Sequence, residues 1–121
     1  MPNSAYRIVL DIGTTTIKAL VFNEQEEVIG KAVALPQKTR PQPGWVEQDP
    51  LELLDFAKRV IITAVRNACI QKTNIESLGI TNQRETIIAW NKITGKPLYP
   101  ATVWEHPRTS TISNTLQAQR P

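Results

Sequence analysis

A run of small and hydroxyl-bearing residues, DIGTTTIK, occupies positions 11–18. A phosphate chain is bound by several N–H donors that point to one spot, and a tight turn of small residues supplies them. Gly13 permits close backbone approach, three threonines add hydroxyl donors, and Lys18 adds a positive charge. Asp11 is a single carboxylate at a strand end, which suits Mg²⁺ beside phosphates because this ion prefers oxygen ligands and keeps several waters. Composition alone also fits an ordinary β-hairpin with a threonine-rich tip, so both interpretations stay open.

A second candidate group is TNQRE at positions 81–85, which follows an apolar run. Arg84 donates hydrogen bonds and Glu85 accepts them, so together they could bind the hydroxyls of a small polyol. Such a pair could hold a nucleophilic hydroxyl in line with a phosphoryl group. The alternative is a surface ion pair of little energetic value.

The elements that must position these residues follow from periodicity and turn chemistry. Apolar and β-branched runs predict strands, and apolar residues at helical spacing after Asp49–Pro50 predict a helix. The expected strands are 6–10, 17–22, 28–35, 77–81, 86–90 and 101–104, and the expected helices are 50–70 and 109–119. The order β-β-β-α-β-β-(β)-α places a hairpin, not a helix, after the first strand, which argues against plain Rossmann and P-loop folds. It is the order at the start of an actin-like ATPase domain, with a later strand parallel to the first.

Three further motifs carry a family resemblance: GWVEQDP at 44–50, GITNQRET at 79–86 and TGKPLYPATVW at 94–104. With the D-x-G-T turn, they resemble the glycerol kinases of the FGGY carbohydrate kinase family. The resemblance implies an α/β actin-like (ribonuclease H-like) ATPase fold, of which residues 1–121 are an incomplete first domain without the second domain. It implies ATP and Mg²⁺ as cofactors and transfer of the γ-phosphoryl group to a terminal hydroxyl of glycerol, giving glycerol 3-phosphate.

The resemblance also assigns roles by position. It implies ATP contacts from Thr14, Thr15, Thr16 and Lys18, a Mg²⁺ contact from Asp11, and glycerol contacts from Arg84, Glu85, Thr14 and Trp104. The catalytic base and the adenosine site of the family lie in later segments, so the 121-residue chain is expected to be inactive alone. Glu105, His106 and Pro107 depart from the family pattern, which leaves a different polyol or sugar open as the substrate. A non-catalytic nucleotide-binding or interaction module is the alternative from another class.

Composition limits the remaining possibilities. Hydrophobic residues make up 40% and charged residues 21%, as in ordinary globular proteins. The 14 basic and 11 acidic residues are scattered, so no nucleic-acid surface is expected. The single Cys69 excludes an internal disulfide and is expected to be buried in the helix. No signal peptide or membrane segment is apparent, so a cytoplasmic protein without a membrane partner is expected, and the full-length parent is expected to be a homo-oligomer.

Overall fold

The computed structural model describes residues 4–84, 86–103 and 110–119. The chain divides into two compact units, Met1–Gln37 with Leu51–Gln83, and Lys38–Pro50 with Arg84–Pro121. In the described part of the chain, no helix combines the length and the apolar character needed to cross a membrane.

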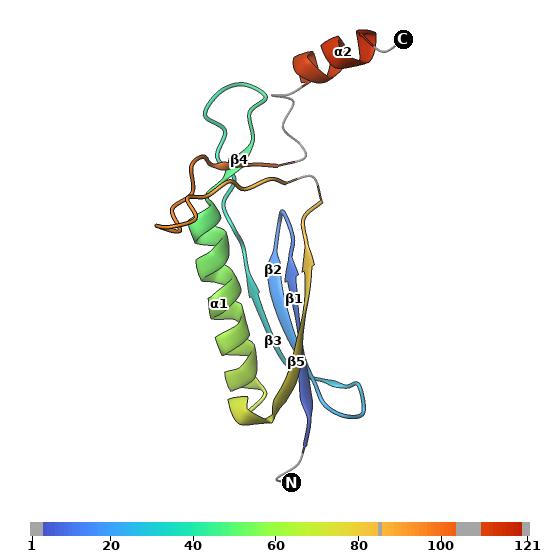
Figure 1. Ribbon diagram of the computed structural model, residues 1–121. Coiled ribbons are helices and arrows are strands. Elements are labelled where there is room, and N and C mark those ends of the chain that lie inside the picture. Colours follow the sequence, from blue (N-terminus) through green and yellow to red (C-terminus); the bar gives the residue numbers. More distant parts are fainter. Residues whose placement is uncertain (1–3, 85, 104–109, 120–121) are drawn as a thin grey trace. The chain divides into compact units, whose positions relative to one another are not determined.

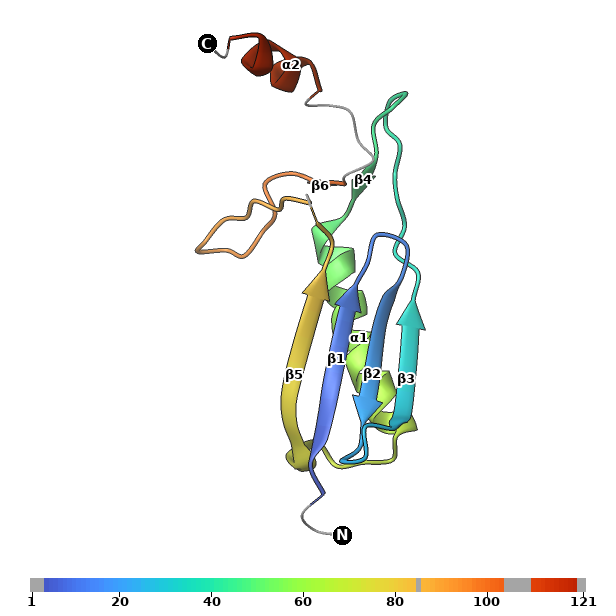
Figure 2. The same ribbon diagram turned by 90° about the vertical axis from the view of Figure 1, so that its right-hand side faces the viewer.

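The first unit is a four-stranded mixed sheet with one long helix (Figure 1). Its elements are β1 (Tyr6–Ile12), β2 (Ile17–Phe22), β3 (Val28–Ala34), α1 (Pro50–Asn67), the short 3₁₀ helix η1 (Lys72–Asn74) and β5 (Ile75–Asn82). The strand order is β3-β2-β1-β5, with β1–β2 and β2–β3 antiparallel and β1–β5 parallel. The predicted three-stranded meander, crossover helix and parallel strand are therefore confirmed, and Figure 2 shows the four strands side by side with α1 behind them.

The core of this unit lies between the sheet and α1. Alternation along β1 and β2 turns every second side chain to the helix. The buried set is Ile8, Leu10, Ile17, Ala19 and Val21 from the strands, with Leu53, Ala57, Val60 and Ala64 from α1. At Gly30 of β3 the helix comes so close that a Cβ atom would lie 2.3 Å from the carbonyl oxygen of Ala64. The sheet therefore has one face covered by α1, and the alternate residues of β1 and β2 lie on the other face.

The end of α1 differs from expectation. The helix was predicted to continue to residue 70, but it ends at Asn67. Cys69 has φ 55°, a left-handed conformation that stops the helix, and its amide donates to the carbonyl of Arg66. The prediction of a buried Cys69 was wrong, because the side chain projects from this helix end and is exposed.

The second unit contains the two-residue strands β4 (Glu47–Gln48) and β6 (Ala101–Thr102), which pair antiparallel, and helix α2 (Ser110–Ala118). β4 was not predicted, and the expected strand 86–90 does not form. Only single bridges occur there, Ile87 with Thr102 and Trp90 with Pro97. Two backbone hydrogen bonds flank the Trp90–Pro97 bridge, from the Leu98 amide to the Ala89 carbonyl and from the Asn91 amide to the Lys96 carbonyl, but they do not extend into a named strand.

Candidate functional site

The turn between β1 and β2 is closed by its own backbone. The amide of Gly13 donates to the carbonyl oxygen of Thr16 at 2.9 Å. A Cβ atom at position 13 would lie 2.8 Å from that same oxygen, so a side chain would force the turn open. Thr14 and Thr16 are half-buried, and Thr15 is exposed. Glycine is thus required for a turn that gathers three threonines within one reversal of the chain.

Asp11 and Lys18 lie beside this turn as direct cross-strand partners. Opposite residues in an antiparallel pair have Cβ atoms about 5 Å apart on the same face of the sheet. Both alternate with core residues, so the carboxylate and the ammonium group lie on the face away from α1. Thr81 of β5 is paired with Asp11 on the other side, in parallel register. A polar row of Lys18, Asp11 and Thr81 therefore crosses the sheet next to the turn.

The residues at the turn fit a magnesium–nucleotide complex. Mg²⁺ bound with phosphates usually takes one or two carboxylates and keeps several waters. Asp11 supplies one carboxylate, and no group of three or more His, Cys, Asp or Glu suited to a metal occurs among the described residues. A metal here would take its remaining ligands from phosphate oxygens and water, which the small residues of the turn leave room for.

One contact of this turn was not predicted from the sequence. The Nε2 atom of Gln83 donates a hydrogen bond to the carbonyl oxygen of Gly13 at 3.0 Å, and the bond is partly buried. Gln83 directly follows β5, whose last residue, Asn82, is paired with Ile12. The parallel pairing of β1 and β5 brings these residues together, so this contact depends on the strand register and has no local signal in the sequence.

The predicted polyol residues are only partly described. Arg84 is exposed and belongs to the second unit, while Glu85 and Trp104 lie outside the described residues, as do Glu105, His106 and Pro107. The convergence of Arg84 and Glu85 beside Thr14 therefore stays a prediction.

The other motifs have local structural roles. In the TGKP segment, Gly95 has φ 72° and its amide donates to the carbonyl of Asn91. The Oδ1 atom of Asn91 accepts from the amides of Ile93 and Thr94 at 2.8 and 2.9 Å. In GWVEQDP, Gly44 has φ 77° and the Glu47–Gln48 pair forms β4. The two glycines thus provide positive φ angles in turns, and Glu47–Gln48 provide a strand, so these residues have structural roles.

Comparison with known proteins defines the class of this chain. Residues 6–120 match the model of the FGGY family of carbohydrate kinases, N-terminal domain, and the chain belongs to this family. The fold agrees, because the chain superposes on the crystal structure of Plasmodium falciparum glycerol kinase with ADP with a TM-score of 0.82 and 29% identity, covering 97% of this chain and 24% of that one. The expected α/β actin-like ATPase fold is confirmed.

Among curated relatives, the chain is 42% identical over 116 residues to a glycerol kinase of Mycoplasmoides gallisepticum. The match covers 96% of this chain and 23% of the relative, so the chain spans about a quarter of that protein's length. Gluconate kinase from Lactobacillus acidophilus gives a TM-score of 0.85 at 17% identity, covering 96% of this chain and 23% of that one. Since a kinase named for another substrate superposes as well, the fold does not discriminate among substrates.

Proposed function

We propose that this chain is the N-terminal part of the first domain of an ATP-dependent glycerol kinase. The parent enzyme transfers the γ-phosphoryl group of ATP to a terminal hydroxyl of glycerol and releases glycerol 3-phosphate. The observation that carries the proposal is the glycine-closed turn at Gly13–Thr16, with Asp11 and Lys18 paired beside it on one face. The similarity to glycerol kinases at 42% identity supports glycerol as the acceptor.

In this proposal the turn holds the phosphates of ATP. Thr14, Thr15 and Thr16 donate hydrogen bonds from backbone and hydroxyl groups, and Lys18 contributes a positive charge that suits a phosphate as a point contact. Asp11 holds Mg²⁺. When bound, the metal neutralises charge on the phosphate oxygens. Phosphoryl transfer relies mainly on positioning and charge neutralisation, so this set of small donors and two opposite charges matches the chemistry.

The polyol site would be supplied by the residues that follow β5. Arg84 donates to glycerol hydroxyls, Glu85 accepts from them, and Trp104 packs against the carbon backbone, while Thr14 contacts both the nucleotide and the transferred phosphoryl group. The catalytic base and the adenosine site lie outside residues 1–121, so the chain alone has no kinase activity. We further propose a cytoplasmic parent that acts as a homo-oligomer on a small molecule, without a nucleic-acid or membrane partner.

A second candidate is an FGGY kinase for another polyol or sugar. The observation in its favour is the sequence Glu105-His106-Pro107, which departs from the family pattern directly after Trp104. A non-catalytic nucleotide-binding module remains the candidate from another class, and it would bind Mg–ATP without supporting transfer.

A chimeric enzyme tests these candidates. The segment of the Mycoplasmoides gallisepticum glycerol kinase that aligns with this chain is replaced by this chain, and ATP consumption is measured with glycerol, longer polyols, pentuloses and gluconate. We expect turnover with glycerol and a fall in kcat/KM of about 100-fold in Arg84→Ala, from loss of charged hydrogen bonds worth roughly 3 kcal/mol. Arg66→Ala, an exposed arginine in the last turn of α1, is the matched control.

The outcomes separate the hypotheses. Full glycerol turnover in Arg84→Ala would reject Arg84 as a substrate residue. Turnover with a pentulose or gluconate in place of glycerol would favour the second candidate. The purified 121-residue chain should show no phosphorylation, and protein-dependent glycerol 3-phosphate from it would place the base within this chain.

A further inference from the structure

The hydrogen bond from Gln83 to Gly13 restrains the turn at Gly13–Thr16, which we call the phosphate turn. β1 and β5 are paired in register up to Ile12 and Asn82, where the backbone ladder ends. Gln83 comes next, and its side-chain amide reaches the Gly13 carbonyl at 3.0 Å. The Gln83 side chain thus contacts the backbone one residue beyond the end of β1 and joins the segment after β5 to the turn.

Both backbone polar groups of Gly13 are held by partners. Its amide donates to Thr16 inside the turn, and its carbonyl accepts from Gln83. A peptide unit is planar and trans, so the carbonyl of Gly13 and the amide of Thr14 point in opposite directions. No cis peptide occurs among the described residues. Because Gln83 attracts the Gly13 carbonyl, the Thr14 amide is directed to the opposite side of the turn.

Glycine makes this restraint necessary. A residue without a Cβ atom tolerates several turn conformations, and a peptide within a turn can rotate by about half a revolution between them. Rotation of the Gly13–Thr14 peptide would replace an amide donor with a carbonyl oxygen, which repels a phosphate. A neutral side-chain amide is well suited to prevent this rotation, since it donates a hydrogen bond without adding charge next to Asp11 and Lys18.

We propose that Gln83 is a positioning residue that holds the Gly13–Thr14 peptide with the Thr14 amide directed at the phosphates. This rests on the proposed function of the turn as a phosphate site. It adds a residue that belongs to neither the D-x-G-T turn nor the Arg84–Glu85 pair. Gln83 directly precedes Arg84 in the chain.

The test uses the ¹⁵N-labelled chain and three variants. Gln83→Leu removes the donor at similar volume, and Gln83→Glu replaces it with a carboxylate that only accepts. Gln71→Leu is the matched control, because Gln71 precedes η1 near the other end of β5 and its side chain makes no capping hydrogen bond. Amide signals of Gly13 and Thr14 are recorded without ligand and then during titration with Mg–ATP.

We expect both Gln83 variants to shift or split the Gly13 and Thr14 signals without ligand, while Gln71→Leu leaves them in place. Loss of one neutral hydrogen bond changes the ratio of the two peptide orientations by about fivefold. The affinity for Mg–ATP follows the fraction of the competent orientation, so it should fall by at most about fivefold. If Gln83→Leu fails to fold, Gln83→Glu provides the same comparison.

Unchanged Gly13 and Thr14 signals in the folded Gln83 variants would overturn the inference, whatever the affinity for Mg–ATP. Shifted signals with an unchanged affinity would overturn it as well. A wild-type Thr14 signal that does not respond to Mg–ATP would instead count against the turn as a phosphate site, and the proposed function is tested separately by the chimeric enzyme. The ligand-free spectra thus distinguish failure of the inference from failure of the proposed function.

Discussion

The contact between Gly30 and α1 gives a sharp test of the packing in the first unit. In Gly30→Ala, the new Cβ atom would lie 2.3 Å from the Ala64 carbonyl oxygen, 2.7 Å from the Ala68 Cβ atom and 2.9 Å from the Ala68 nitrogen. These distances are far below van der Waals contact, and two of the three atoms are backbone. The strand and the helix must therefore separate by about 1 Å, because ordinary carbon contacts require about 3.5 Å.

The expected loss of stability follows from this separation. Overpacking of a well-packed core costs about 1–3 kcal/mol. The clash here also strains the hydrogen bond from the Ala68 amide to the Ala64 carbonyl. We therefore expect a loss near the upper end, about 3 kcal/mol, which corresponds to a fall in Tm of roughly 10 °C for a domain of this size.

Gly79→Ala is the matched control. Gly79 lies in β5, and a Cβ atom there would meet nothing within 4 Å. We expect its free energy of unfolding to stay within about 0.5 kcal/mol of wild type, as for most surface substitutions. Urea denaturation followed by circular dichroism measures both variants. Equal stability of Gly30→Ala and Gly79→Ala would refute the close approach of α1 to β3.

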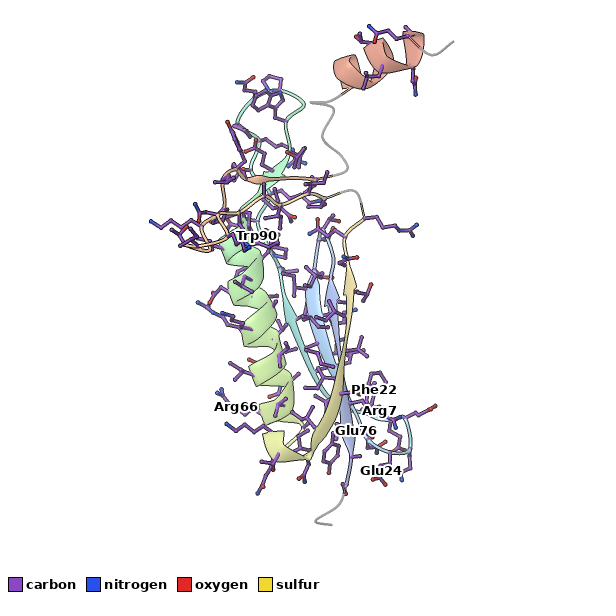
Figure 3. All side chains as sticks on the ribbon, viewed as in Figure 1. Arg7, Phe22, Glu24, Arg66, Glu76 and Trp90 are labelled. Carbon is purple, nitrogen blue, oxygen red and sulfur yellow. The ribbon has the colours of Figure 1, made fainter. Side chains whose placement is uncertain are left out.

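Further predictions concern the β2–β3 turn, the phosphate turn and a surface ion pair. The Oδ1 atom of Asn23 accepts from the amides of Gln25 and Glu27 at 3.0 and 2.9 Å, so Asn23→Ala should lower the free energy of unfolding by about 1–2 kcal/mol in urea denaturation. Lys18→Met should weaken Mg–ATP binding about tenfold in a calorimetric titration, and an unchanged salt dependence of binding would count against a phosphate contact. Arg7 and Glu76 form an exposed ion pair of 3.3 Å at the end of the sheet away from the phosphate turn (Figure 3), and a double-mutant cycle should give a coupling energy below about 1 kcal/mol.

The first unit was predictable because its local patterns and its tertiary packing agree. Alternation in YRIVL and IKALVF places one set of side chains in the core, and the helical spacing after Pro50 places another set against it. Pro50 at the first helical position marks the start of α1, as the sequence indicated. The end of α1 was missed because a left-handed Cys69 has no clear signature in sequence.

The second unit was less predictable because its strands depend on distant partners. β4 has two residues, which pair with β6, and Glu47 also bridges Thr39, so no local run of apolar residues signals this strand. The TIIAW run has the composition of a strand, but only isolated bridges form there, Ile87 with Thr102 and Trp90 with Pro97. Composition predicts a tendency, and the partner strand decides whether a ladder forms.

The amino-acid sequence by itself determined the family, the meander with its crossover helix, and the Gly13 turn as the candidate phosphate site. These follow from short motifs and from periodicity, which are local properties. The tertiary structure decided the polar row of Lys18, Asp11 and Thr81 and the hydrogen bond from Gln83 to Gly13. That bond joins residues 70 positions apart. Only the parallel register of β1 and β5 brings them within hydrogen-bond distance, and a one-residue slip would turn each side chain to the other face.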